Sequence, residues 1–367
     1  MRADAPPPEA LVSQSTTAAI TLGGRVLASD IPVVAGRVAI QVDQDVPQAV
    51  DLTLPHEWEQ YVLDPTRPGA VLGADGHEIE IVTTLATESR TWRLPMSRYL
   101  VSSWDVDGAS VRVKATGLLT RVQEYQAATA RTLDQRSPIV SEIMRILRDV
   151  GLESVVDRRL PSTTRAPAGF EIGEDQLAAL QGLAAAMPCT VRQWWDGAIH
   201  LTPALDESRL SPVLSWDDSA EGTIVTPAVS GSRADLYSHF VVPWSREVTS
   251  WDPEGEETTE TFSGVVEQLV ATGRLDYRTF GRRTRRIESD AIATHAQAQA
   301  VGINEAARAH LRARTLEVTM AADYRAELDD PVALTVAGET VVGRITGVEY
   351  PLTPDDGDMA LTVGVPA

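Results

Sequence analysis

Two segments near the middle of the chain, SPIVSEIMRILRDVG (137–151) and LAALQGLAAAMPCTVRQWWDGAIHLTP (177–203), carry the clearest structural signals. In the first, Ser137 suits a helix N-cap, and Pro138 suits the first helical position, where its missing N–H would have no partner. Apolar residues then recur at helical spacing, and Gly151 suits the left-handed residue that closes a helix. The first segment therefore predicts a short amphipathic helix.

The second segment predicts a helix followed by a hairpin. Its leucines lie on one apolar face at helical spacing, and Pro188 ends the helix. Strands over 190–195 and 198–203 are joined by Asp196-Gly197, which fits a type I′ turn because both residues can take positive φ. Together the two segments predict a small α/β domain, with expected bounds of 127–211.

The N-terminal tract, residues 18–126, follows a short flexible arm expected over 1–17. Short runs that alternate apolar and polar residues, separated by turn signals, predict a β-sandwich or a partly closed barrel. The strands are expected at residues 18–22, 38–42, 50–54, 79–81, 91–93, 100–104 and 111–113.

The C-terminal tract, residues 212–367, also predicts β structure, interrupted by one long helix over 289–314 that Ser289-Asp290 can cap. Its acidic, threonine-rich stretch 252–261 is expected to form an exposed loop. Strands are expected at 213–216, 223–225, 237–242, 248–251, 315–320, 332–336, 341–349 and 359–365. The predicted fold class is therefore mainly β with an α+β insertion, in which two barrel-like or sandwich-like domains flank the α/β domain.

Composition limits the possible functions. The 367 residues are 43% hydrophobic and 23% charged, which is typical of a globular protein. No apolar run approaches the length of a membrane span, and the N-terminus lacks the apolar core of a secretory signal. A formal charge of −20 argues against nucleic-acid binding, which depends on neutralising phosphates. Lys114 is the only lysine among many arginines, which suggests a GC-rich genome, such as that of an actinobacterium or its virus.

One stretch opposes the acidic balance. Six arginines cluster within a short span: Arg274, Arg278, Arg282, Arg283, Arg285 and Arg286. Two interpretations stay open, a solvated basic loop that pairs with acidic residues nearby and a contact with an acidic partner subunit.

No combination of residues carries a catalytic signature. Cys189, the only cysteine, cannot form an intrachain disulfide and is expected to be a small buried apolar residue. The six histidines (His56, His77, His200, His239, His295 and His310) form no zinc-binding pattern, and no P-loop, G-x-S-x-G or G-x-G-x-x-G motif is present. We therefore predict no catalytic, cofactor-binding or metal-binding residues, no cofactor and no enzymatic activity.

The eight tryptophans offer candidate contact residues. Trp194 and Trp195 are adjacent in an expected strand, so they should point to opposite faces. Two interpretations stay open: both serve only as core residues, or one lies in a core while the other faces a partner or a neighbouring domain. Trp216, Trp244 and Trp251 are expected either in cores or at interfaces, where tryptophan often anchors binding.

The layout resembles the central hub proteins of phage tails, from the baseplate hub of contractile tails to the tail-tip hub of siphophages. The stretches similar to actinobacteriophage minor tail proteins are ITLGGRVL (20–27), LQGLAAA (180–186), WDGAIHL (195–201) and VGRITGV (342–348). This resemblance implies a virion component, made in the host cytoplasm, that forms a homotrimer with a pseudo-sixfold ring through which DNA passes. It implies contacts with the distal tail protein, the tape-measure protein and receptor-binding or spike proteins.

An acidic lumen would fit this role, because it repels the phosphates of passing DNA. Many siphophage relatives carry a C-terminal cell-wall hydrolase or fibre module. This sequence ends at Ala367, soon after the last expected strand, so no lytic activity is expected. Two alternatives stay open: a tail-associated glycan hydrolase, which needs a cleft with paired carboxylates, and a carbohydrate-binding module, which needs a flat row of exposed aromatics.

Overall fold

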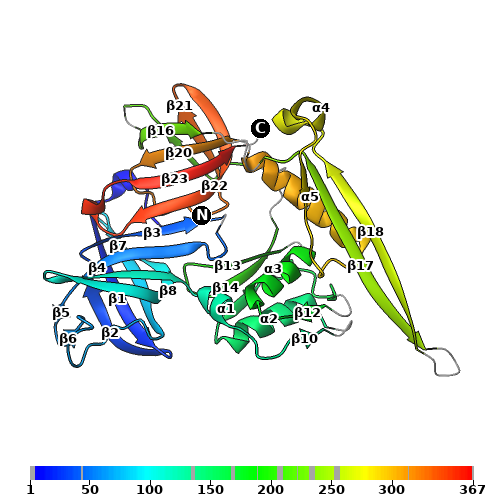
Figure 1. The fold of residues 1–367 in the computed structure, drawn as a ribbon. Helices are drawn as coiled ribbons and strands as arrows, with labels where there is room; N and C mark the ends of the chain where they lie inside the picture. The colour runs from blue at the N-terminus through cyan, green and yellow to red at the C-terminus, as the bar shows by residue number, and fades with distance from the viewer. Residues whose placement is uncertain are drawn as a thin grey trace.

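A computed structural model describes residues 5–42, 44–133, 137–166, 170–187, 189–204, 210–220, 222–230, 236–251, 257–312 and 314–365. Its largest element is a sheet of thirteen described strands, with the order β16-β20-β23-β22-β3-β4-β9-β8-β7-β1-β2 and with β15 and β21 branching from β22 (Figure 1). The predicted fold class, mainly β with a small α/β insertion, is confirmed.

The N-terminal part of this sheet forms as the alternating pattern predicts. β4, for example, alternates buried and half-buried residues along its length, as a strand with one face on a core should. The strands are β1 (Ser13–Leu22), β2 (Arg25–Pro32), β3 (Ala35–Gln41), β4 (Gln48–Pro55), β7 (His77–Ala86), β8 (Thr91–Asp107) and β9 (Ser110–Gly117). β8 merges two expected strands into one, and β1 begins at Ser13, ahead of the expected first strand. A small ladder of β5 (Glu57–Trp58) and β6 (Tyr61–Val62) and a 3₁₀ turn, η1 (Pro8–Ala10), lie outside the sheet.

The C-terminal part continues the same sheet. Its strands are β15 (Leu214–Asp217), β16 (Ile224–Ser230), β20 (Arg314–Met320), β21 (Pro331–Val336), β22 (Glu339–Pro351) and β23 (Met359–Val365), with a 3₁₀ turn, η3 (Pro354–Asp356). β22 pairs with β3 from Gly347↔Gln41 to Pro351↔Arg37, which joins the two β tracts edge to edge. Buried residues of both tracts form one hydrophobic core. Sequence analysis does not predict this joining, because pairing between such distant residues leaves no local signal.

The α/β domain has its own core and contains the two helices and the hairpin that its sequence predicts. The helices are α2 (Ile139–Asp149) and α3 (Gln176–Ala186), and the hairpin is formed by β13 (Cys189–Gln193) and β14 (Ile199–Pro203). The structure adds α1 (Thr120–Glu124) and the short strands β10 (Arg131–Thr132), β11 (Ser154–Val156) and β12 (Glu171–Ile172). Gly151 has φ +74°, as expected of the residue that closes α2. Pro188 lies outside the described residues.

Two details of this domain differ from prediction. Pro138, not Ser137, is the N-cap of α2, and it provides no side-chain cap. The hairpin turn is not type I′, because Gly197 N–H donates to Trp194 O and only Gly197 has positive φ. β13 already ends at Gln193, so both tryptophans belong to the connection rather than to a strand.

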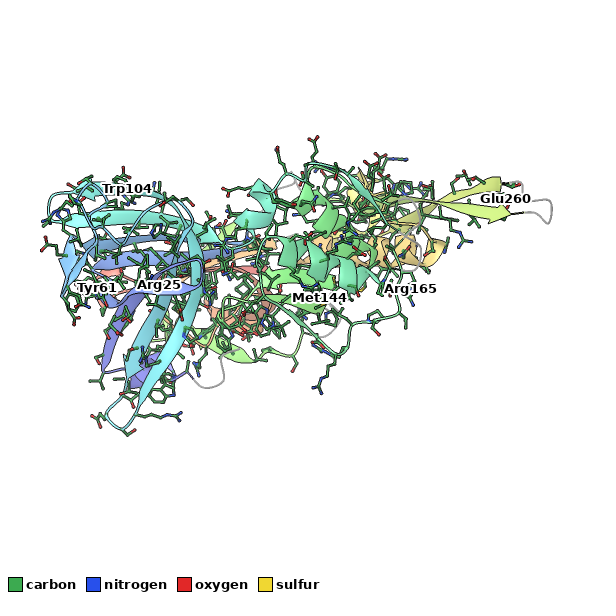
Figure 2. All side chains as sticks on the ribbon, turned by 90° about the horizontal axis from the view of Figure 1, so that it is seen from below. Arg25, Tyr61, Trp104, Met144, Arg165 and Glu260 are labelled. Atoms are coloured by element: carbon green, nitrogen blue, oxygen red, sulfur yellow. The ribbon has the colours of Figure 1, made fainter. Side chains whose placement is uncertain are left out.

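The remaining elements form a long hairpin supported by a helix. β17 (His239–Trp251) and β18 (Glu257–Leu269) pair over their whole length, and α5 (His295–Arg312) covers their inner half (Figure 1). The 3₁₀ turn η2 (Gly273–Leu275), the short helix α4 (Tyr277–Phe280) and the strand β19 (Thr284–Arg286), which pairs with the start of β17, lie at the base. Figure 2 shows Glu260 far out on the projecting hairpin.

This region corrects two predictions. Residues 257–261, expected in a loop, begin β18, while residues 252–256 lie outside the described chain. The long helix begins at His295 rather than near residue 289, because Ser289 instead accepts a bond from the Ala291 N–H in a separate turn.

Candidate assembly surfaces

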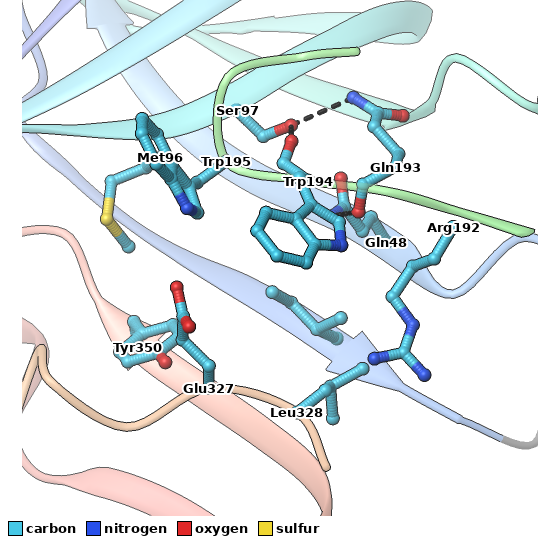
Figure 3. Close-up of a pocket in the computed structure, with 11 residues that line it drawn as sticks. Gln48, Met96, Ser97, Arg192, Gln193, Trp194, Trp195, Glu327, Leu328 and Tyr350 are labelled. Atoms are coloured by element: carbon cyan, nitrogen blue, oxygen red, sulfur yellow. Dashed lines mark hydrogen bonds between the residues drawn. The ribbon is translucent and has the colours of Figure 1, made fainter. Parts of the chain in front are cut away.

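A buried glutamine fixes the α/β domain to the large sheet. Gln193, at the end of β13, donates through Nε2 to Ser97 Oγ (2.8 Å) and to Arg98 O, and its Oε1 accepts the Leu118 N–H (2.6 Å). Its backbone carbonyl accepts a bond from Gln48 Nε2 at 2.9 Å (Figure 3). Because these groups are buried, each needs its partner, so the position of Gln193 is tightly specified.

The same junction reaches the C-terminal part of the sheet. Arg192, beside Gln193, forms an ion pair with Asp329 (2.5 Å), and both side chains are largely buried. Ser97, which adopts φ +88°, donates from Oγ to the Trp194 carbonyl at 2.8 Å. The α/β domain therefore contacts both tracts of the sheet through adjacent residues. Sequence analysis missed this role, because a single glutamine in a strand carries no local signal.

Trp194 and Trp195 border a small pocket at this junction. The pocket has a volume of about 80 Å³ and is also lined by Met96, Glu327 and Tyr350 (Figure 3). Each tryptophan is more than a third exposed, and the Trp194 ring stacks on the imidazole of His200 with centroids 4.3 Å apart. Pockets for drug-sized ligands are several times larger, so this one suits a few ordered waters or a single inserted side chain.

The other tryptophans have different environments. Trp216 is buried and donates from Nε1 to Asp323 at 2.9 Å, so it is a core residue. Trp244 is half-buried on β17 and lies over Gly264 on the partner strand. The Trp251 side chain lies outside the described part of the chain.

The arginine cluster gathers at the base of the hairpin, around α4 and β19. Arg283 and Arg285 stand over the Tyr237 ring, with guanidinium carbons 4.9 and 5.9 Å from its centroid. Arg278 and Arg282 stand over the Tyr277 ring in the same way. Contact with the Tyr277 hydroxyl raises the pKa of Arg278 above its ordinary value, so this side chain stays charged.

Acidic residues nearby balance part of this positive charge. Arg285 pairs with Glu305 on α5 (3.4 Å), and Arg286 pairs with Glu288 (2.5 Å). Arg274 and Arg282 are exposed. The interpretation as a loop that pairs with nearby acidic residues therefore holds for Arg285 and Arg286.

The cysteine and most of the histidines of the described chain lie in different elements. Burial raises the pKa of the Cys189 thiol to about 12, which keeps it protonated and unreactive near neutrality. His77, His200 and His239 lie in separate strands, and the His310 side chain is outside the described part. No three His, Cys, Asp or Glu side chains among the described residues gather where they could hold a metal ion. The described helices include none that is both long and apolar enough to span a bilayer.

Two of the edge strands of the large sheet, β2 and β16, are irregular. β2 pairs with β1 through two register shifts, and its Asp30 adopts φ +54°. β16, at the opposite edge, contains Pro227 and a register shift after Ile224. Bulges and prolines on edge strands hinder the addition of a strand from another molecule. Assembly through side-chain contacts is therefore favoured over extension of the sheet at these two edges.

Solved structures with a similar fold include tail proteins. No protein-family model matches the sequence, and no curated protein matches it. The fold is similar to that of a tail protein from Neisseria meningitidis, with a TM-score of 0.63 and 12% identity over 95% of this chain and 96% of the other.

Two prophage proteins give comparable results. A 43 kDa tail protein of prophage MuSo2 from Shewanella oneidensis has a TM-score of 0.57 and 13% identity over 95% of this chain and 98% of its own. The prophage tail protein gp18 from Listeria monocytogenes has a TM-score of 0.53 and 9% identity over 95% and 94%. At such low identity the likeness establishes the fold, and the match runs along almost the whole of each chain.

Proposed function

We propose that this chain is a structural component of a phage tail, acting as a hub at the tail tip or baseplate. The observation that carries the proposal is the shared fold, which covers nearly all of this chain and of three tail proteins. Agreement over whole chains favours the same kind of part, because a domain recruited to another function would match only locally. The protein would be made in the host cytoplasm and become part of the virion. The resemblance favours a siphophage of an actinobacterium as its source.

The hub is a homotrimer in this proposal. Seven described strands of the large sheet come from the N-terminal tract and six from the C-terminal tract, and the two groups meet at the β3–β22 pair. Two comparable β lobes in each of three subunits give six wall units around an axis. This arrangement reconciles a threefold tip with a sixfold tail tube. We propose the three domains expected at residues 18–126, 127–211 and 212–367, with the first beginning at β1 (Ser13) and the second at α1 (Thr120).

DNA would pass through the centre of the ring. The formal charge of −20 suits a channel that conducts DNA without binding it, because acidic walls repel phosphates. We place the distal tail protein and the tape-measure protein on the tube side. Receptor-binding or spike proteins occupy the distal side. The role is structural, and no enzymatic step belongs to it.

The mass of the purified protein in solution tests the trimer directly. We expect about 119 kDa by light scattering, three times the 39.6 kDa of one chain. Imaging of the assembled particle should place three copies around the tail axis at the tip. A twofold dimer in the virion would contradict the hub. Release of peptidoglycan fragments above a buffer control would favour the hydrolase alternative instead.

A further inference from the structure

The hairpin strand β18 has an open edge. Within the described chain, β18 pairs with β17 on one side only, and the order of this small sheet, β18-β17-β19, ends there. Figure 1 shows β18 on the outer side of the projecting hairpin. Its thirteen residues pair with β17 in unbroken register and include no proline. β18 therefore lacks the register shifts and the proline that blunt the edges β2 and β16.

The bonds of β17 show which backbone groups of β18 face this edge. On the side of β17 away from β18, the Ser245 N–H donates to Ile292 O at 3.2 Å, and Val241 O accepts the Ile287 N–H at 2.9 Å. In an antiparallel pair, residues directly opposite each other point their backbone groups either both inward or both outward, in alternation along the strand. Ser263, opposite Ser245, therefore points its N–H and C=O away from β17.

Four successive outward-pointing residues of β18 form a row that is exposed to solvent: Thr261, Ser263, Val265 and Glu267. In the described chain, no strand, turn or helix outside the hairpin forms a backbone hydrogen bond with these four residues. The row is roughly 20 Å long, at the usual rise of a strand. Such a row of free N–H and C=O groups is the template to which an extended peptide adds as a further strand.

A pocket beside the middle of this edge offers space for side chains of an added segment. It has a volume of about 410 Å³ and is bordered by Ser263, Gly264 and Val265 of β18 and by Trp244 of β17. The Trp244 indole lies across Gly264, because a Cβ atom on that glycine would be only 2.8 Å from Nε1. The buried indole N–H has no acceptor within the described chain. An acceptor supplied by the added segment would satisfy it, since a buried donor without a partner is costly.

Charge selects among the possible occupants of this edge. β18 contains three glutamates and no basic residue, and Glu260 and Glu267 are exposed, the latter beside His239 at 3.4 Å. A segment with basic side chains would therefore be complementary. The β18 strand of a second copy would instead bring the same glutamates to the pair, and like charges on opposite strands are destabilising. Antiparallel pairing of two β18 strands would also give a twofold dimer, which does not close a threefold ring.

We propose that the edge of β18 binds an extended, proline-free segment of a different protein, which adds to the hairpin as a further strand. Backbone hydrogen bonds along residues 261–267 hold the segment, and its basic side chains lie near Glu260 and Glu267. The proposal rests on the proposed function for the source of the segment, a neighbouring tail protein. The open edge itself does not depend on the trimer.

Hydrogen exchange of single amides tests whether the edge is open. In the protein alone, the outward amides should exchange about tenfold or more faster than the inward amides that bond to β17. The outward amides are those of Thr261, Ser263, Val265 and Glu267, and the inward ones are those of Phe262, Gly264 and Val266. Uniform exchange along this part of β18 would overturn the proposal, because the outward groups would then have partners.

A synthetic peptide, Lys-Thr-Val-Thr-Val-Thr-Val-Thr-Lys, serves as the probe of strand addition. At saturation it should slow exchange of the outward amides of β18 by about fivefold or more, because they become hydrogen-bonded. The same peptide with both lysines replaced by glutamate should bind about threefold or more weakly in low salt. A third peptide, N-methylated at every interior residue, has lost its donors. Equal binding of this third peptide would overturn the proposal, because the contact would not be made through backbone groups.

A pair of variants at one position provides the matched test in the protein. Ser263→Pro removes an outward N–H and leaves the bonds between β17 and β18 in place, so it should weaken binding of the lysine peptide by about tenfold. Ser263→Ala keeps the N–H and should bind within about threefold of the wild type. Thermal unfolding shows that both variants fold. Equal affinities in the two variants would contradict strand addition at this edge.

Imaging of the assembled particle identifies the natural occupant and separates this proposal from the proposed function. We expect an extended segment of a different protein beside residues 261–267 of every copy. A bare edge in the particle, or a strand from a second copy of this chain, would overturn the proposal while a trimeric hub stands. If no trimer forms but the lysine peptide adds to the edge as expected, the hub is wrong and the binding edge stands.

Discussion

At the scale of single residues, Gly36 shows how closely the two tracts of the sheet approach. Its N–H donates to both carboxylate oxygens of Asp356, at 2.9 and 3.0 Å. A Cβ atom at this position would lie 2.6 Å from the Asp51 carbonyl and 2.7 Å from the Leu52 Cα, which are backbone atoms that cannot move aside. The φ of +153° adds strain for any other residue. Glycine is therefore required at this point of β3, where the backbone of β4 runs close beside it.

We expect Gly36→Ala to lower the free energy of unfolding by about 2 to 4 kcal/mol, because the new methyl overlaps backbone in a close-packed sheet. Gly69→Ala is the matched control. Gly69 also has positive φ, +80°, but no atom lies within 4 Å of its would-be Cβ, so only about 1 kcal/mol of strain is expected. Urea unfolding followed by tryptophan fluorescence measures both. Equal losses in the two variants would mean that the close approach is relieved elsewhere.

Cys189 gives a second prediction at this scale. Burial raises the pKa of its thiol from 9.0 to about 12, so the native thiol is protonated at pH 8. Because the folded pKa is the higher one, this group's contribution to stability is complete below about pH 9 and is lost as pH rises toward 12. We expect iodoacetamide at pH 8 to label the urea-unfolded protein readily and the native protein at least tenfold more slowly. Equal labelling rates by mass spectrometry would contradict the buried environment.

At the scale of elements, the sequence predicted the helices and the hairpin that form through contacts between residues close together in the chain. α2 and α3 follow from apolar spacing and their closing residues, and the β13–β14 hairpin follows from the turn at Gly197. The predicted type I′ turn was wrong because the sequence does not show where β13 ends. β13 ends at Gln193, whose side chain is bound in the junction, so Trp194 and Trp195 lie in the turn.

Elements that depend on distant partners were missed. The start of β18 is polar on both faces, so its sequence resembles a loop, and it is a strand only because β17 pairs with it. The arginine cluster was evident from composition alone. Its stacking on Tyr237 and Tyr277 was not, because those tyrosines have no periodic relation to the arginines. The joining of β3 to β22 was hidden for the same reason.

The junction at Gln193 provides the prediction at this scale. Gln193→Leu keeps the approximate volume but leaves the Leu118 N–H and the Arg98 carbonyl buried without a partner, which should cost about 2 to 4 kcal/mol. Hydrogen exchange should show faster exchange at the β13–β14 hairpin and at Leu118, while β20 and β23 exchange at the wild-type rate. Gln123→Leu, on the exposed face of α1, should change stability by less than about 0.5 kcal/mol. Matching exchange patterns in both variants would show that Gln193 does not hold the domains together.

At the scale of the whole molecule, the two ends of the chain stabilise one sheet. Gln14 on β1 donates to the Tyr324 hydroxyl (2.6 Å), and Tyr324 stacks on Tyr350 of β22 with centroids 5.6 Å apart. One core runs beneath both tracts, so they should unfold together rather than in sequence. The hairpin, in contrast, projects from this body with small clusters of its own. Assembly surfaces can therefore change without loss of the main fold.

The last prediction uses this separation between body and projecting hairpin. Replacing Arg282, Arg283, Arg285 and Arg286 with serine removes two exposed ion pairs and the contacts over the tyrosine rings, which should lower protomer stability by about 1 to 3 kcal/mol. The core beneath the large sheet is untouched, so the protomer should still fold. If the cluster is an intersubunit contact, trimer dissociation should increase by more than this stability loss accounts for, and light scattering should show mainly 39.6 kDa protomer where the wild type is trimeric.

A control variant changes four exposed arginines elsewhere to serine and should leave the trimer intact; these are Arg25, Arg90, Arg158 and Arg159. If the trimer persists in the cluster variant as in the control, the arginines serve only to solvate the base of the hairpin, and the ring must be closed by other surfaces.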